Sequence, residues 1–352
     1  MPAFAEFMDR LIMALRPPLT AEMLPGLAEA AFAGLPWPPP EPEPGEADAV
    51  LETMAAAIRE LPDPFQAGRL CLLAGAFVEQ GAPAAAVAGP IAARARATFA
   101  IVRGFVERID PERKGVADPA AYFAESPGEV AAYLGAEFTG MAAMTTLCRD
   151  KSARIAARGL PGFAADADAI SHAIPTGYYL SELLACVDDF RLDVIHPEQG
   201  RGFRLLLDGV RNNFHLFTLV QGMLTGDPAE GWLEGPARDP LVVEYARGRL
   251  QEPPRDHDDS VWTFSNWPAW TGGAVSQLPG YWVWGEGSPR DIRPFRGTPT
   301  VLLSRLAIGG RSWGIEFCAP LHGAHQAELS VLGMMTAAEV ERLLADMAAD
   351  LA

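Results

Sequence analysis

Apolar residues recur every three or four positions over most of the first 250 residues, and this spacing predicts one amphipathic helix after another. Alanine and leucine dominate these segments, while a proline or glycine interrupts the pattern at intervals of roughly fifteen to thirty residues. The predicted helices span residues 3–16, 20–34, 46–60, 64–80, 83–109, 127–158, 176–192, 200–224 and 238–250. We therefore expect residues 1–250 to form a mainly α, all-helical domain.

Two helix starts have a clear local cause. Asp63, Pro64 and Gln66 supply an N-cap acceptor, a proline at the first helical position and a side chain that can complete a capping box. Ser126 and Glu129 repeat this arrangement. The spacing of the helix starts favours pairs of about 40 residues, as in a HEAT-like α-solenoid, but no residue pattern repeats with that period. An irregular helical bundle is therefore the alternative architecture.

The pattern changes after residue 250. Residues 251–260 combine two prolines with a run of charges, which predicts an exposed linker. Alternating apolar residues then predict strands over 261–266 and 281–286. A helix follows at 336–352, opened by a capping box of the type Thr-x-x-Glu. We expect residues 261–352 to form a small α+β domain with an antiparallel sheet and a C-terminal helix.

A hairpin is predicted within this C-terminal domain, over residues 300–318. Gly309 and Gly310 can supply the positive φ angles of a two-residue hairpin loop, and β-branched and apolar residues flank them. The pairs that face each other in this register are Leu306 with Trp313, Ser304 with Ile315, and Leu302 with Phe317.

Composition and charge restrict the function classes. The chain has 352 residues, of which 45 are acidic and 28 basic, so the formal net charge is −17. Nucleic acids and anionic membranes attract cationic surfaces, and we expect neither as a partner of this acidic protein. Four widely spaced cysteines form no CxxC pair, and no targeting or membrane-spanning segment is recognised in the sequence. A cytoplasmic location is the expectation.

The common catalytic and phosphate-binding motifs are not found in the sequence. The run from Asp188 to Asp193 holds three carboxylates and resembles the aspartate-rich motif of class I terpene synthases, which implies Mg²⁺ held against a diphosphate. No second metal-binding motif of that family follows, and the strand-rich C-terminal part does not fit it. A solvated helix end is the interpretation that we favour for this run.

A mixed nitrogen and oxygen metal site is the second chemical lead considered. His257, Asp258, His322 and His325 carry suitable ligand atoms, and a linker that folded back would join them. Nothing in the sequence beyond composition connects the two clusters. We therefore predict no metal site, and the sequence leaves the identity of any cofactor open.

Helix 200–224 carries the most pointed polar pattern. Large apolar residues surround most of the predicted helix, which predicts burial, while a narrow strip remains polar. Buried polar groups require partners, and the preceding predicted helix offers two acids. Either these groups form structural ion pairs between two central helices, or they line a ligand pocket. The candidate binding residues of this strip and its neighbour are Asp208, Arg211, Asn212, His215, Glu182 and Asp189.

Tryptophans gather after residue 260, in a chain that has eight of them. Such residues can pack in a core, stack on a planar ligand or form the central contacts of a protein interface. A strand over 281–286 would present two of them on one face. The candidate binding residues of this cluster are Trp262, Trp267, Trp270, Trp282 and Trp284.

Two functions agree with these patterns. The first, which we favour, is a binding module that recognises a protein partner or a small ligand through a concave helical face and the tryptophan-rich patch. The second is a hydrolase- or transferase-type enzyme with a polar site between the helical domain and the C-terminal domain. Convergent polar side chains in a cleft would favour the enzyme, whereas internally paired polar groups and an open apolar patch would favour the module.

Overall fold

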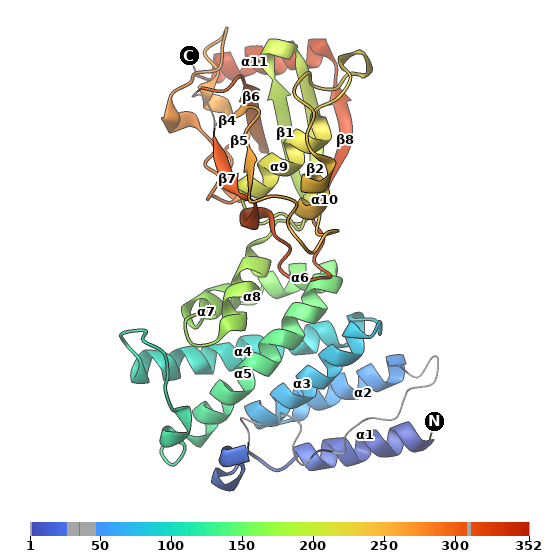
Figure 1. Cartoon of the computed structure of the whole chain (residues 1–352), viewed down its shortest axis with the longest axis vertical. Coiled ribbons are helices and arrows are strands. Elements are labelled where there is room, and N and C mark those ends of the chain that lie inside the picture. Colours follow the sequence, from blue (N-terminus) through green and yellow to red (C-terminus); the bar gives the residue numbers. More distant parts are fainter. Residues whose placement is uncertain (1, 27–34, 36–46, 308–310, 352) are drawn as a thin grey trace. The chain divides into compact units, whose positions relative to one another are not determined.

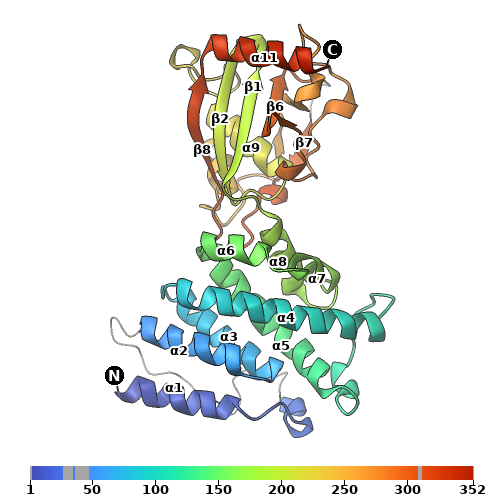
Figure 2. The same cartoon turned by 180° about the vertical axis from the view of Figure 1, so that it is seen from behind.

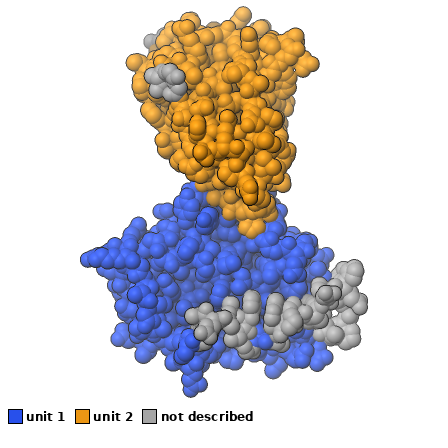
Figure 3. All heavy atoms as spheres, in the orientation of Figure 1, with its two compact units in different colours: residues 1–184 blue, residues 185–352 orange. Residues whose placement is uncertain are grey.

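The computed structural model describes residues 2–26, 35, 47–307 and 311–351 (Figure 1). The chain divides into two compact units, residues 1–184 and residues 185–352 (Figure 3). The expected linker at residues 251–260 lies inside the second unit. Residues 190–208 form strands of the second unit's sheet, so residues 1–250 are not one all-helical domain.

The first unit is helical throughout its described part. The helices expected to begin near residues 3, 46, 64 and 83 are confirmed. The helix expected over 20–34 is a short 3₁₀ segment at its start, and its residues 27–34 lie outside the described residues. The elements are α1 (Pro2–Leu15), η1 (Ala21–Gly26), α2 (Ala47–Glu60), α3 (Pro64–Glu79), α4 (Ala85–Ile109), η2 (Pro119–Tyr122), α5 (Pro127–Arg149), α6 (Lys151–Arg158), α7 (Phe163–Ala169) and α8 (Pro175–Ala185).

Capping residues explain several of these boundaries. The Asp63 carboxylate accepts a hydrogen bond from the Gln66 backbone N–H at 2.9 Å, as its N-cap position predicts. The Gln66 side chain does not close a capping box; its Nε2 donates to the carbonyl oxygen of Pro17. The helix expected over 127–158 is two helices, because Asp150 leaves the helical conformation and caps α6 by accepting from the Ala153 N–H.

Helices α3 and α5 approach each other at two glycines. A Cβ atom added at Gly68 would lie 2.6 Å from the carbonyl oxygen of Gly135, so a larger residue cannot occupy this crossing without a backbone shift. Helix α5 also packs against α4, and α2 packs against α4. These contacts bury the apolar faces of the helices against one another.

Helix α4 is the one described helix whose length and apolar content reach those of a membrane span. Its buried residues pack inside the helical unit, among them Phe99, Val102 and Phe105. A core helix of a water-exposed protein has the same properties. By itself, helix α4 is therefore weak evidence for a membrane span.

The second unit is built on a six-stranded mixed sheet with the order β4-β6-β1-β2-β8, in which β5 pairs with β6 (Figures 1 and 2). Strands β1 and β6 are parallel and the other neighbours are antiparallel. The sheet strands are β1 (Phe190–His196), β2 (Arg201–Asp208), β4 (Thr263–Asn266), β5 (Pro294–Phe295), β6 (Thr298–Ser304) and β8 (Glu328–Met335). A separate pair consists of β3 (His257–Asp259) and β7 (Ser312–Gly314).

Helices and short 3₁₀ segments connect and cover these strands. The helices are α9 (Asn213–Leu224), α10 (Pro240–Ala246) and α11 (Ala337–Leu351). The 3₁₀ segments are η3 (Pro197–Gln199), η4 (Pro228–Glu230), η5 (Trp267–Ala269), η6 (Pro279–Tyr281), η7 (Pro289–Asp291) and η8 (Ile315–Cys318). The chain is thus mainly α with one region of sheet, in agreement with the expected fold class.

Two apolar clusters pack on the two faces of the sheet. Helices α9 and α10 cover one face, where Phe217 packs among residues such as Phe203 and Leu205. Helix α11 packs with the other face through residues such as Met347, in a cluster that includes Ile195. Consecutive residues of β1 and β2 point to opposite faces, and because both faces are covered, most apolar residues of these central strands are buried.

The helix expected over 176–192 is wrong in its second half. The helix expected over 200–224 is wrong in its first half. Helix α8 ends at Ala185, and β1 and β2 occupy residues 190–208. Phe203, Leu206 and Leu207 have a spacing that fits a helix, but the same residues alternate between the two covered faces of a sheet. Gly209 then adopts a φ of +67°, which ends β2 and turns the chain into α9.

The hairpin expected over 300–318 does not form. Strand β6 pairs with β1 and β4, whereas β7 pairs with β3, and residues 315–318 form η8 instead of a strand. Leu302 therefore lies opposite Ile195 and Ser265, not opposite Phe317. The Gly309–Gly310 turn lies outside the described residues.

Of the remaining C-terminal predictions, some are confirmed and one is wrong. The strand expected over 261–266 is confirmed as β4, but residues 281–286 contribute a single bridge from Trp282 to Ser265. The terminal helix is confirmed together with its capping box: the Thr336 hydroxyl accepts from the Glu339 N–H, and the Glu339 carboxylate accepts from the Thr336 N–H. These backbone and hydroxyl bonds, with Arg204, lower the pKa of Glu339 to about 2.

Candidate functional site

The predicted polar strip lies at the junction between β2 and α9, not along one helix. Asp208 ends β2, Arg211 lies in the turn, Asn212 caps α9 and His215 lies in its first turn. The junction is closed by a pair of reciprocal bonds: the Asp208 carboxylate accepts from the Asp189 N–H at 2.8 Å. These residues therefore come together as expected, but they hold the turn in place.

The first acid of the run from Asp188 to Asp193 also holds this turn in place. The Asp188 carboxylate accepts from the Gly209 N–H at 3.0 Å, which completes the reciprocal pair with Asp208. Residues 190–193 belong to β1, so the run is not a helix end, and Asp193 lies opposite Arg204 on β2. The resemblance to the terpene synthase motif is therefore not supported, because that motif needs its carboxylates on one helix.

His215 has hydrogen-bond partners for both ring nitrogens. Its Nε2 lies 2.7 Å from the carbonyl oxygen of Ala246, and its Nδ1 accepts from the Arg211 N–H at 3.4 Å. Burial lowers the pKa of His215 to about 4, so the imidazole is neutral at pH 7. The Asn212 side chain accepts from the His215 N–H and donates to the carbonyl oxygen of Phe317.

Arg211 and the two acids of the preceding segment complete the strip. Arg211 donates from Nη1 to the carbonyl oxygen of Ala319 at 2.8 Å. Glu182 lies on α8 in the first unit, whereas Asp189 belongs to the second unit and adopts a positive φ of 51°. Residues 201–208 form a strand, so the second central helix of the expected pair is absent at this place.

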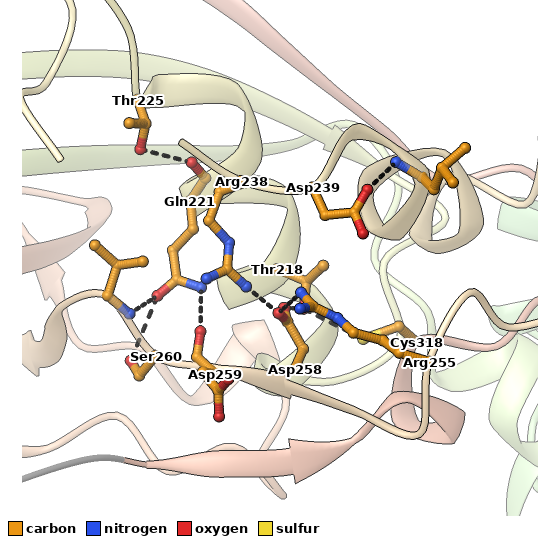
Figure 4. A network of polar contacts seen from close by, with 12 residues as sticks. Thr218, Gln221, Thr225, Arg238, Asp239, Arg255, Asp258, Asp259, Ser260 and Cys318 are labelled. Atoms are coloured by element: carbon orange, nitrogen blue, oxygen red, sulfur yellow. Dashed lines mark hydrogen bonds and ion pairs between the residues drawn. The ribbon is translucent and has the colours of Figure 1, made fainter. Parts of the chain in front are cut away.

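Asp258 is the centre of a second, buried polar network (Figure 4). Its carboxylate is fully buried and accepts from the Thr218 hydroxyl at 2.8 Å, from Arg255 at 2.9 Å and from Arg238. Cys318 contacts Thr218 from the other side, and burial raises the pKa of its thiol to about 12. This network fastens β3 to α9, inside the segment that the sequence indicates as an exposed linker.

Gln221 adds a parallel set of bonds one turn further along α9. Its Nε2 donates to the carbonyl oxygen of Asp259 at 3.2 Å, and its Oε1 accepts from the Val261 N–H. Figure 4 shows the side chains of Thr218 and Gln221 extending from α9 towards β3. Sequence reasoning missed this network, because its members lie about 40 positions apart in the chain.

The considered metal site is not assembled. The Asp258 carboxylate is occupied by two arginines, while His325 is buried with its Nε2 3.9 Å from the Cys186 sulfur. Within the described ranges, no group of three or more histidine, cysteine, aspartate or glutamate residues is arranged to hold a metal ion.

The predicted tryptophan cluster divides into buried and exposed members. Trp262 is buried under α9, and Trp267 and Trp270 pack with the cluster that α11 covers. The Trp267 indole N–H donates to the carbonyl oxygen of Pro294 at 3.0 Å. These three residues are core and flank residues, which leaves Trp282 and Trp284 as the candidates for contact with another molecule.

Trp282 and Trp284 form a tilted pair with ring centroids 5.6 Å apart. Trp284 is 51% exposed. The Arg311 guanidinium lies 5.1 Å from the Trp284 ring centroid and 5.7 Å from the ring centroids of Phe214 and Phe217. Burial lowers the pKa of Arg311, and the guanidinium stacked on three rings holds Trp284 in place.

Two further exposed apolar side chains adjoin this pair. Leu306 lies with Trp282 and Arg311 around a cavity of about 20 Å³, and Phe317 packs on Phe214 with ring centroids 4.9 Å apart. The buried indole nitrogen of Trp282 has no hydrogen-bond partner among the described residues. We call Trp282, Trp284, Leu306, Arg311 and Phe317 the tryptophan–arginine surface.

The chemistry of the tryptophan–arginine surface is that of a contact surface. It offers aromatic faces and one cation, and no acid or histidine is among the residues that line its cavity. Sequence reasoning found its two tryptophans but not Arg311, whose position above Trp284 results from tertiary packing alone. No family model, curated protein or solved structure matches the chain.

Proposed function

We propose that this protein is a non-catalytic binding module, and that its tryptophan–arginine surface recognises a protein partner. The observation that carries the proposal is the half-exposed ring of Trp284, fixed between solvent and the Arg311 guanidinium. Tryptophan and arginine are the residues most enriched among those that dominate binding energy at protein interfaces. A rigid, half-exposed aromatic ring also loses little conformational entropy on binding.

The state of the polar candidates supports a module over an enzyme. His215 is neutral, buried and bonded at both nitrogens, and Asp258 is enclosed by three donors. Cys318 has a raised pKa and holds no reactive thiolate at pH 7. A general base or nucleophile must reach a substrate, and these groups contact the protein's own backbone and side chains instead.

The size of the cavity favours a protein partner over a small ligand. A cavity of about 20 Å³ accommodates about one water molecule, so a sugar or nucleotide ring cannot enter it. A partner would instead lie across the exposed ring of Trp284 and the neighbouring side chains of Leu306 and Phe317. Extended and proline-rich peptides bind aromatic surfaces in this way.

The helical unit is proposed to contribute a second contact surface, as the concave face of its array. Helix α8 offers two adjacent aromatic residues for this role, since Tyr178 and Tyr179 are 49% and 47% exposed. Their rings contact each other edge to face, with centroids 5.4 Å apart. Tyrosine supplies both apolar area and a hydroxyl, which suits a surface that is wet when unbound.

The test compares partner capture by matched variants. The full chain is immobilised and exposed to extract of the organism that produces it, and bound proteins are quantified by mass spectrometry. Trp284→Ala should reduce a specifically bound protein about thirtyfold, as expected for a central aromatic contact worth about 2 kcal/mol. Leu351→Ala is the matched control, because Leu351 is 46% exposed but lies on α11, outside the surface.

Two outcomes would contradict the proposal. Equal capture by the wild type and Trp284→Ala would exclude the tryptophan–arginine surface as the contact site. A turnover of any substrate that survives Trp284→Ala would contradict a purely binding role. Thermal unfolding of each variant is measured alongside, so that a loss of folding is not counted as a loss of contact.

A further inference from the structure

A cavity of about 150 Å³ lies in the helical unit, at the C-terminal end of α4. The last turn of α4 and its C-cap residue supply Glu107 and Asp110, the loop that follows supplies Arg113, and the segment after α7 supplies His172. The apolar part of the wall consists of Val106, Pro111, Ala169 and Ile170. None of these residues belongs to the tryptophan–arginine surface, so the cavity is a separate feature of the chain.

The Asp110 carboxylate is a fixed negative charge in the wall of this cavity. Its Oδ1 accepts from the Lys114 N–H at 2.9 Å, its Oδ2 accepts from the Gly115 N–H at 2.7 Å, and its side chain is only 9% exposed. These backbone bonds, the one from Lys114 above all, lower the pKa of Asp110, so the carboxylate is ionised at pH 7. Each carboxylate oxygen has two lone pairs, and Asp110 can therefore accept a further hydrogen bond from a ligand cation.

His172 lies beside Asp110 with its polar atoms unpaired. Its Nε2 is 3.7 Å from the Asp110 Oδ2, which is too far for a hydrogen bond. Both ring nitrogens are buried, and neither has a hydrogen-bond partner among the described residues. Burying a donor and an acceptor without partners costs free energy, and a native structure that keeps such groups requires an explanation. A molecule in the cavity with a donor and an acceptor offers the ring, once it turns, the partners that the described chain does not.

Arg113 supplies the uncommitted positive charge of the cavity. Its guanidinium makes no hydrogen bond or ion pair within the described part of the chain. By contrast, the Arg103 guanidinium in the same wall already bonds Glu107 at 2.8 Å and Asp166 at 3.0 Å. Arg113 also adopts a φ of 55°, a conformation that favours glycine. Strained residues of this kind cluster at ligand sites, and this one brings a charge to the cavity.

We propose that this cavity binds a small zwitterion, an α-amino acid with an aliphatic side chain. The ligand carboxylate pairs with the Arg113 guanidinium, the ligand ammonium group donates to Asp110, and the aliphatic side chain packs on Val106 and Ile170. A ligand with only one charge leaves either Arg113 or Asp110 without a counter-charge, so both charged groups contribute to binding. The volume is below the roughly 300–1,000 Å³ of sites for drug-sized ligands, which restricts the ligand to a small molecule.

Isothermal titration calorimetry of the full chain at pH 7 tests this inference. The probes are L-alanine, L-valine and L-leucine, and at least one of them should bind with a Kd of about 1 mM or tighter. Probes that lack one charged group then test the assignment. For L-valine these are isovalerate, which lacks the ammonium group, and isobutylamine, which lacks the carboxylate. Each should bind about tenfold more weakly or worse, because one charge-assisted contact is lost.

A matched pair of variants locates the binding. Arg113→Gln removes an exposed side chain that the fold does not use, and should raise the Kd of the amino acid about tenfold or more. Arg59→Gln is the control, because Arg59 is exposed on α2, outside the cavity, and this variant should keep the wild-type Kd. No binding of any of the three amino acids would overturn the inference. Isovalerate that binds as tightly as L-valine, or Arg113→Gln with the wild-type Kd, would overturn it as well.

Discussion

The imidazole of His215 and the carbonyl oxygen of Ala246 lie 2.7 Å apart, and this bond joins α9 to α10 inside the second unit's core. Because Nδ1 accepts from the Arg211 N–H, the hydrogen of the neutral ring is on Nε2. A protonated ring would lose the Nδ1 acceptor and place a charge in an apolar core. Burial accordingly lowers the pKa of His215 from 6.5 to about 4.

This depressed pKa predicts that acid destabilises the second unit through His215. Between pH 6.5 and about 4, the unfolded chain binds a proton at this residue and the folded chain does not, so the free energy of unfolding falls as the pH falls. The full effect is about 3 kcal/mol, at about 1.4 kcal/mol per pH unit. Urea unfolding of the wild type and of His215→Gln at pH 7, 5.5 and 4 measures it as the difference in slope.

The control for this pH effect is His257→Gln, because His257 is exposed on β3. That variant should keep the wild-type dependence on pH. His215→Gln should be less stable at pH 7 by about 1–3 kcal/mol, since an acceptor for the Arg211 N–H is lost, yet it should lose less stability on acidification. An equally steep loss in His215→Gln would show that other groups cause the acid sensitivity.

Asp258 is predicted to be the most sensitive polar residue of the second unit. Asp258→Ala leaves Arg238 and Arg255 without their common acceptor in a buried position, and should lower the free energy of unfolding by about 3–5 kcal/mol. Its neighbour Asp259 is exposed, and Asp259→Ala should change stability by about 0.5 kcal/mol or less. Chemical denaturation followed by circular dichroism compares the two; equal effects would contradict the buried network.

The helical unit could be predicted from the sequence because its signals are local. The Asp63 cap and the periodic apolar residues of α3 and α4 act within one helix. The strands over residues 190–208 could not be predicted in the same way. Phe203 and Leu207 fit a helical spacing, and what makes them strand residues is pairing with β8, more than 100 positions away. A local pattern carries no information about such a partner.

The predicted hairpin is wrong and the candidate site was found only in part. Both outcomes have the same cause, because the deciding contacts join residues that are far apart in the sequence. A glycine pair between two apolar runs is typical of a hairpin, but β6 pairs with β1 and β4 in the centre of the sheet instead of with the segment that follows it. Trp282 and Trp284 could be selected by composition as surface candidates. Arg311 could not, because its stacking on Trp284 depends on where η8, α9 and the segment after β4 meet.

Trp284 is predicted to account for a distinct part of the protein's quenchable fluorescence. Its ring is 51% exposed, whereas Trp262 and Trp313 are 4% exposed. Acrylamide should therefore quench one component of the emission readily, and Trp284→Phe should remove that component. Trp262→Phe is the control and should leave the quenched component unchanged. Emission that acrylamide does not quench in the wild type would place Trp284 in the core and remove the proposed contact residue.

The closest approach of α3 and α5 predicts opposite effects for two glycine substitutions. A Cβ at Gly68 would lie 2.6 Å from the carbonyl oxygen of Gly135, so Gly68→Ala should force the helices apart and cost about 1–3 kcal/mol. Gly104 on α4 is exposed and has nothing within 4 Å of its would-be Cβ, so Gly104→Ala should stabilise the chain by about 0.5–1 kcal/mol.

Thermal unfolding measured on both glycine variants distinguishes packing from helix propensity. If propensity alone governed these helices, both variants would melt above the wild type, since alanine favours a helix over glycine at either position. The crossing at Gly68 and Gly135 instead requires that Gly68→Ala melts below the wild type while Gly104→Ala melts above it. Two increases in melting temperature would mean that α3 and α5 are not in contact through these glycines.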